Sequence, residues 1–124
     1  MTSTNTSRPG TKRYDLEDRT LQFAKDVRQF IRTLPRTVCN VEDAKQVVRS
    51  SGSIGANYIE ANEALGKKDF QLRVKISRKE AKETRYWLRL LHVKTPEAES
   101  QRDALIREAT ELMNIFGAIL RKTQ

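Results

Sequence analysis

The sequence has little of the sulfur and imidazole chemistry that stabilises small disulfide-rich or zinc-binding domains. Its 124 residues include one cysteine, Cys39, and one histidine, His92. A single cysteine forms no intramolecular disulfide, and a metal site of cysteines and histidines needs more than these two residues. We therefore expect Cys39 to be a small, half-buried residue near the start of a helix.

Glycine and proline are also scarce, with five and three residues, and alternating β-branched residues are few. Both observations argue against a β-rich fold. No apolar run approaches the roughly 20 residues of a membrane-spanning helix. The opening MTSTNTSRPGTKR has no apolar signal core. We expect a soluble, cytoplasmic protein that has no membrane partner.

Residue sets that support catalysis or hold cofactors are missing as well. There is no glycine-rich phosphate loop and no Ser/His/Asp or Cys/His set. Metal sites in helical bundles use Glu-x-x-His pairs. Glu60, Glu80 and Glu83 have no such histidine, because His92 lies nine residues after Glu83. We therefore expect no enzyme activity, no metal or cofactor, and no small-molecule substrate.

The chain does carry four amphipathic segments, in which apolar residues recur at steps of three and four and so predict helices. These run over about residues 16–34, 41–65, 70–93 and 96–122. Pro35 ends the first helix, and Asn40 is expected to cap the second. Gly66 is expected to end the second helix and Asp69 to cap the third. Short connections then predict an all-α, antiparallel up-down four-helix bundle over residues 14–124. A flexible basic tail over residues 1–13 precedes it.

The segment SSGSIGAN, residues 50–57, is a local loop signal inside the second predicted helix. The apolar spacing continues through Ile54 without a phase break, which favours an uninterrupted helix. Its small residues would then let a neighbouring helix approach closely: Gly52, Ser53, Gly55 and Ala56. A break in the helix is the alternative, because each glycine inside a helix costs about 1 kcal/mol relative to alanine.

The net charge of +8 is concentrated in the third predicted helix and the residues that flank it. Residues 67–94 contain ten basic and three acidic residues, which gives +7. Six of the basic residues form a basic stripe along one helix face: Lys75, Arg78, Lys79, Lys82, Arg85 and Arg89. Such a stripe suits a row of phosphates, so we predict that it binds RNA or DNA. A protein-interaction scaffold with an acidic protein partner is the alternative, and a solvated face without a partner stays open.

A second surface of the third predicted helix is mixed apolar and acidic, and consists of Leu72, Ile76, Glu80, Glu83, Trp87 and Leu90. A bundle helix needs only one buried stripe, so this surface predicts burial against another subunit. The second helix offers a polar counterpart. We therefore predict a homo-oligomer that is built on a mixed face of seven residues: Ser53, Asn57, Glu60, Ile76, Glu80, Glu83 and Trp87. Alternatively, Trp87 covers the edge of one wide core.

Three stretches of the chain are distinctive: YDLEDRTLQFAKDV (residues 14–27), SSGSIGANYIEANEA (residues 50–64) and DFQLRVKISRKEAKETRYWLRLL (residues 69–91). In this order they resemble the 23S rRNA-intervening-sequence family of bacterial four-helix bundle proteins. The resemblance covers nearly the whole chain from Tyr14 onward. It highlights ten positions, most of which look structural: Arg19, Ser53, Asn57, Tyr58, Glu60, Phe70, Glu80, Glu83, Tyr86 and Trp87.

The resemblance also implies a quaternary structure and a class of partner. Members of the family are similar in forming a homopentameric ring or cone, so the resemblance implies a pentamer. The accessory proteins of diversity-generating retroelements are related pentameric bundles that bind a reverse transcriptase and nucleic acid. The family name itself records the location of genes more than an activity.

Overall fold

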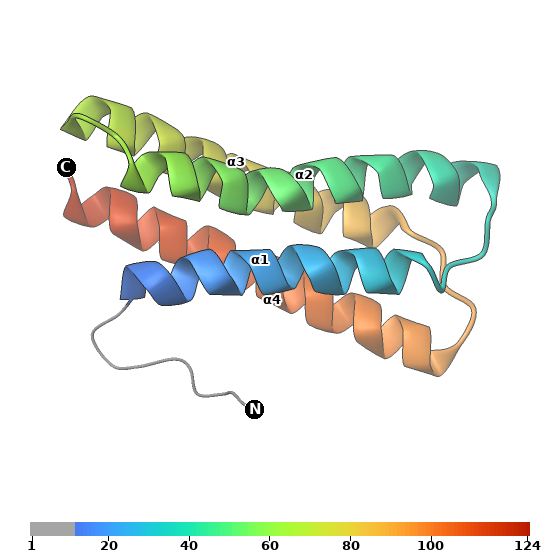
Figure 1. Cartoon of the computed structure of the whole chain (residues 1–124). Coiled ribbons are helices and arrows are strands. Elements are labelled where there is room, and N and C mark those ends of the chain that lie inside the picture. Colours follow the sequence, from blue (N-terminus) through green and yellow to red (C-terminus); the bar gives the residue numbers. More distant parts are fainter. Residues whose placement is uncertain (1–11) are drawn as a thin grey trace.

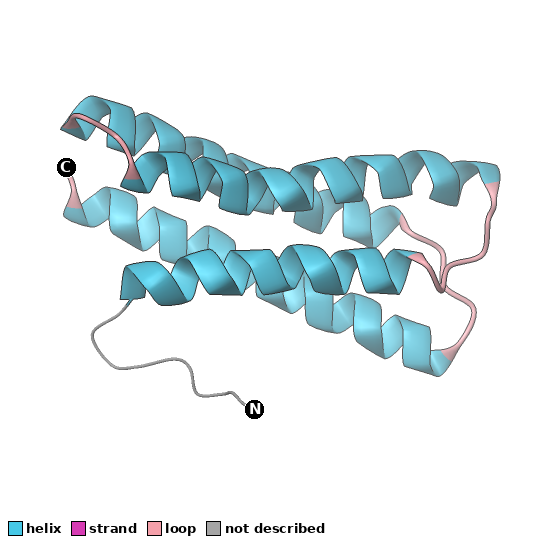
Figure 2. Cartoon of the chain, in the orientation of Figure 1, coloured by secondary structure: helices cyan, strands magenta, loops and turns pink. Residues whose placement is uncertain are grey.

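The computed structural model describes residues 12–124, and within them it contains four helices and no strand. These are α1 (Lys12–Ile31), α2 (Val38–Asn62), α3 (Lys67–Leu90) and α4 (Pro96–Lys122). Consecutive helices run in opposite directions, and short loops join them (Figures 1 and 2). The predicted all-α four-helix bundle is confirmed. The predicted tail lies outside the described residues, except for its last two residues, which belong to α1.

The core is apolar and draws on all four helices. Its fully buried side chains include Val27 of α1, Ile54 of α2, Leu88 of α3 and Leu112 of α4. Burial of an aliphatic side chain of this size stabilises the fold by about 1.5–3 kcal/mol. None of the four helices is long and apolar enough to cross a membrane.

Helix α2 continues through residues 50–57 without interruption, so the predicted continuous helix is confirmed and the alternative break is wrong. A Cβ atom at Gly55 would lie 2.8 Å from Thr20 Oγ1 of α1. Real Cβ atoms essentially never come this close to another atom. Glycine therefore lets α1 and α2 pack against each other here, and this packing outweighs its poor helix propensity.

The predicted cap of α2 is wrong. Thr37, not Asn40, is the N-cap, and its hydroxyl accepts a hydrogen bond from the Asn40 N–H at 3.1 Å. Asn40 lies inside the first turn, where its buried side chain bonds to the main chain of Pro35 and His92. Cys39 is exposed in the same turn, contrary to the expectation of half burial.

The boundary between α2 and α3 also differs from the prediction. Helix α2 ends at Asn62, with Glu63 as its C-cap, and Leu65 lies beyond it with a fully exposed side chain. Gly66 caps the N-terminus of α3 instead of ending α2. Asp69 is not a cap but lies in the first turn of α3, where the helix dipole favours its negative charge.

Candidate nucleic-acid interface

The basic stripe lies on α3, on the side that adjoins α4. The rotation of α3 is fixed by Val74, Ala81 and Leu88, which recur every seven residues and are fully buried. The stripe residues are offset from this buried line, so their side chains point outward. Arg85 is half-buried, and the other five residues of the stripe are exposed. Most of the charged side chains of the predicted stripe therefore lie on the surface.

No residue of the basic stripe forms an ion pair within residues 12–124. In contrast, Arg19, Arg49 and Arg102 each pair with at least one carboxylate within 4.0 Å. The positive charge of the stripe is thus uncompensated in this part of the chain. Like charges that share one face repel each other, and an anionic partner would relieve that repulsion.

Part of the stripe lines a surface hollow of about 340 Å³ between α3 and α4. The α3 side consists of Lys75, Arg78, Lys79 and Lys82, and the α4 side of Gly117, Leu120, Arg121 and Gln124. The sequence reasoning missed Arg121. Its place next to the stripe follows from the antiparallel order, because the end of α4 must lie beside the first half of α3.

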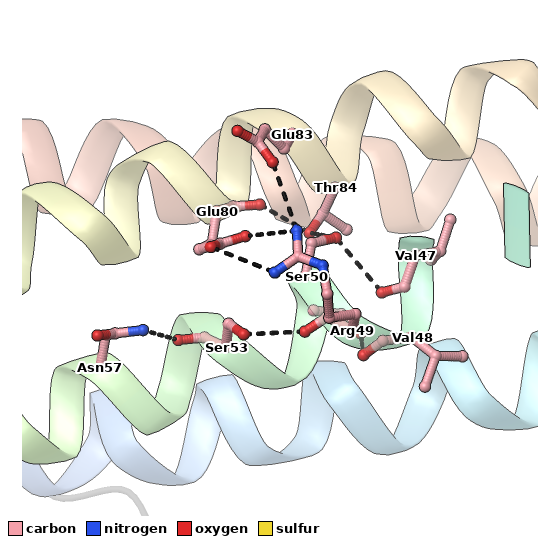
Figure 3. Close-up of polar contacts among 10 residues, drawn as sticks. Val47, Val48, Arg49, Ser50, Ser53, Asn57, Glu80, Glu83 and Thr84 are labelled. Carbon is pink, nitrogen blue, oxygen red and sulfur yellow. Dashed lines mark hydrogen bonds and ion pairs between the residues drawn. The ribbon is translucent and has the colours of Figure 1, made fainter. Parts of the chain in front are cut away.

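Arg49 of α2 connects two residues of the mixed face (Figure 3). Its Nη2 atom lies 3.3 Å from Glu80 Oε1 and 3.5 Å from Glu83 Oε1. Glu80 is 8% exposed, and a buried carboxylate needs such a partner. Sequence reasoning missed Arg49, because the residue spacing within one helix does not indicate which ion pairs form with another helix.

The polar residues of the mixed face on α2 are also bonded within the chain. The Ser53 hydroxyl donates to Arg49 O at 3.0 Å, and Asn57 Nδ2 donates to Ser53 O at 2.9 Å (Figure 3). Arg73 of α3 donates to Asn57 Oδ1 at 3.2 Å. These groups therefore do not need a second subunit for their hydrogen bonds, whereas Glu60 is exposed.

The apolar part of the mixed face is half-covered. Trp87 packs against the core cluster, and its ring meets Tyr86 edge-on at 5.2 Å between centroids. Ile76 is half-buried. Beside them, Leu72 is 53% exposed and Leu90 is 48% exposed. This outer surface of α3 thus combines the half-buried side chains of Ile76 and Trp87 with the exposed side chains of Leu72 and Leu90.

Buried hydroxyl groups hold α2 and α3 together beneath this face. Thr84 Oγ1 lies 2.7 Å from Ser50 Oγ, and the Ser77 hydroxyl donates to Ile54 O at 2.9 Å. Thr84 Oγ1 also donates to Glu80 O at 2.8 Å, and Ser50 follows Arg49 in the chain, so the hydroxyl pair adjoins the Arg49–Glu80 pair (Figure 3). Small hydroxyl side chains permit close packing, and their directional bonds fix how the two helices align.

The carboxylates that the sequence singled out do not form a metal site. Among residues 12–124, no group of three or more His, Cys, Asp or Glu side chains is placed to hold a metal ion. The carboxylates of Glu80 and Glu83 both pair with the guanidinium group of Arg49.

Comparisons with known proteins agree with this architecture. A family model described as 23S rRNA-intervening sequence protein matches residues 12–118. A crystal structure of a protein with unknown function from the S23 ribosomal protein family of Bacteroides thetaiotaomicron VPI-5482 is 32% identical to the chain. The match covers 90% of this chain and 99% of that one, with a TM-score of 0.75. No curated protein matches the chain.

Proposed function

The chain belongs to the 23S rRNA-intervening sequence protein family, and we propose that it is a non-enzymatic, oligomeric bundle that binds RNA or other nucleic acid through the basic stripe. One observation carries this proposal. Six cations share one face of α3 and have no carboxylate partner within residues 12–124, although other arginines of the bundle are paired. A face with unopposed positive charge favours a polyanion.

The dimensions of the stripe fit this role. From Lys75 to Arg89 it spans about 21 Å, at about 1.5 Å per helical residue. Contacts of lysine and arginine with phosphates release counterions, so binding weakens as salt rises. Contacts of this kind carry little sequence information. The stripe therefore favours binding that depends strongly on salt and weakly on base sequence.

A salt titration tests the proposal. Binding of a fluorescent RNA duplex of roughly 20 base pairs is measured by anisotropy from about 50 to 200 mM salt. Affinity should fall at least about a hundredfold over this range if most of the stripe contacts phosphates. The absence of salt-sensitive binding at low ionic strength, to this duplex and to DNA, would overturn the proposal.

A matched pair of triple variants separates the stripe from net charge. The stripe variant combines Lys75→Gln, Lys79→Gln and Lys82→Gln. The control combines Lys25→Gln, Arg32→Gln and Arg36→Gln, which remove the same charge from exposed positions on and after α1. The stripe variant should flatten the salt dependence by about three in log–log slope. Equal losses in both variants would show that only net charge matters.

An acidic protein is the other candidate partner, and a nuclease experiment distinguishes it. The tagged protein is purified from cells with and without nuclease treatment. Loss of co-purifying material after nuclease supports the nucleic-acid proposal. An acidic protein that remains bound after nuclease, and that the stripe triple variant no longer retains, would favour the protein-interaction scaffold.

The oligomer is part of the same proposal, with a pentamer as the state that family resemblance implies. Exposed Leu90 next to Trp87 and exposed Leu72 next to Ile76 support it, because exposed apolar side chains that adjoin other apolar residues mark interaction sites. Light scattering tests it directly. A species of 14.3 kDa, the mass of one chain, at micromolar concentration would refute the oligomer without affecting the nucleic-acid proposal.

A further inference from the structure

Two guanidinium groups from neighbouring helices meet above one glycine. Gly117 of α4 is buried. A Cβ atom built on it would lie 3.5 Å from Arg121 Nη1 and 3.6 Å from Arg78 Nε. The two side chains therefore converge on the space that the missing side chain leaves open. This point lies in the hollow that Lys75, Lys79 and Lys82 also line.

The convergence is held by a bond between the same two helices. Gln71 Nε2 of α3 donates to Thr123 O at 2.7 Å, and it lies 3.4 Å from Thr123 Oγ1. This contact fixes the end of α4 against the first half of α3, two residues after Arg121. The packing of α4 against α3, and not the flexibility of the Arg121 side chain, thus places Arg121 next to Arg78.

No acidic residue lines the hollow. Neither Arg78 nor Arg121 forms an ion pair with any carboxylate in the described part of the chain. Two guanidinium groups that face one point without a counterion repel each other. An anion at that point would change the repulsion into two charge-assisted contacts, and guanidinium groups suit phosphate oxygens because their N–H donors form a fixed fork.

We propose that the hollow above Gly117 is a binding site, the phosphate seat, for a single backbone phosphate of the bound nucleic acid. Arg78 and Arg121 would both donate hydrogen bonds to this phosphate. This inference rests on the proposed function and sharpens it. The stripe would supply a diffuse row of charge, whereas the seat would fix the register of the backbone on the bundle. Arg121 of α4 thereby joins an interface that otherwise belongs to α3.

Two variants test the seat with the same RNA duplex. Arg121→Gln removes one of the two guanidinium groups, and Arg32→Gln is its control, an exposed arginine with no ion pair among residues 12–124. Gly117→Leu fills the hollow without any change of charge. Ala104→Leu, which adds a similar side chain to an exposed position of α4, is its control. Leucine is a better helix former than glycine, so the bundle should still fold.

Arg121→Gln should weaken RNA binding roughly tenfold and lower the salt slope by about one. Gly117→Leu should weaken binding to a similar extent at unchanged net charge, and both controls should bind as the wild type does. If either seat variant behaves like its control while the stripe triple variant loses binding, the seat is wrong and the proposed function stands. If the wild type shows no salt-sensitive binding at all, both proposals fail.

Discussion

The side chain of Asn40 bonds to both main-chain groups of His92. Its Nδ2 atom donates to His92 O at 2.9 Å, and its Oδ1 atom accepts the His92 N–H at 2.9 Å. The same Nδ2 atom also donates to Pro35 O at 3.0 Å. One buried amide therefore joins the connection between α1 and α2 to the connection between α3 and α4, at one end of the bundle.

Replacement of Asn40 by alanine should be strongly destabilising. It would remove three part-buried hydrogen bonds to the main chain of Pro35 and His92, at a cost of about 2–4 kcal/mol in the free energy of unfolding. Urea denaturation followed by circular dichroism measures this loss. Asn114→Ala, at an exposed position of α4, should change stability by less than about 0.5 kcal/mol. A loss below about 1 kcal/mol for Asn40→Ala would contradict this account.

The two glycines of the segment over residues 50–57 should respond to alanine with opposite signs. Gly55→Ala should destabilise the fold by about 1–3 kcal/mol, because the new methyl group overlaps Thr20. At Gly52 the new Cβ would meet only the flexible end of Arg28, at 3.4 Å. Gly52→Ala should therefore gain up to about 1 kcal/mol from helix propensity. Thermal unfolding of the two variants measures the difference.

A double variant checks the cause of the loss at Gly55. Thr20→Ala removes the oxygen that the new methyl group would meet first, and Thr20 bonds only to main-chain oxygens of its own helix. The pair Thr20→Ala and Gly55→Ala should thus recover about half of the stability that Gly55→Ala loses. Simple additivity of the two single variants would show that close packing of α1 on α2 is not the reason for glycine.

Arg19 should contribute modestly to stability, in a salt-dependent way. Its Nε and Nη2 atoms lie 2.7 and 2.8 Å from Glu108, and Nη2 also lies 2.7 Å from Glu111. The hydrogen bond to Glu108 raises the pKa of the guanidinium group above its ordinary value, so Arg19 stays charged and its contribution is fully present throughout the neutral pH range. Arg19→Gln should cost about 1 kcal/mol. The cost should shrink in molar salt, and an undiminished loss there would argue against an electrostatic origin.

Assembly should depend on two residues of the mixed face that differ in their role in the fold. Trp87→Ala should weaken the oligomer by a few kcal/mol, as is typical of interface aromatics. Because Trp87 also packs against the core of its own chain, Glu60→Lys is the cleaner variant. Its exposed side chain has room for lysine within the chain, and Glu63→Lys, at the exposed C-cap position of α2, is the control. Unchanged sedimentation of both variants would remove the mixed face from the interface.

The sequence predicts helix rotation well because burial repeats with the period of the helix. Val74, Ala81 and Leu88 recur every seven residues in the sequence of α3, and all three are fully buried. The same period places the basic stripe on the surface. The continuity of α2 follows from the same reasoning, since Ile54 keeps the apolar phase across two glycines.

Features that depend on partners distant in sequence could not be predicted in this way. Asn40 is a common N-cap residue type, and its true partner, His92, is 52 residues away. Arg49 bonds to Glu80 across 31 residues. Arg121 reaches the stripe only because α4 is antiparallel to α3. Such contacts depend on how far two packed helices are offset along their axes. The apolar period of a single helix does not encode this offset.

The Arg19 link between α1 and α4 has a consequence for how the bundle opens. Surface hollows of about 570 and 780 Å³ flank this link, and Arg19 lines both of them. By contrast, buried hydroxyl bonds join α2 to α3. Thermal breathing should therefore begin where α1 meets α4, and amide protons of α1 should exchange with deuterium before those in the centre of α3.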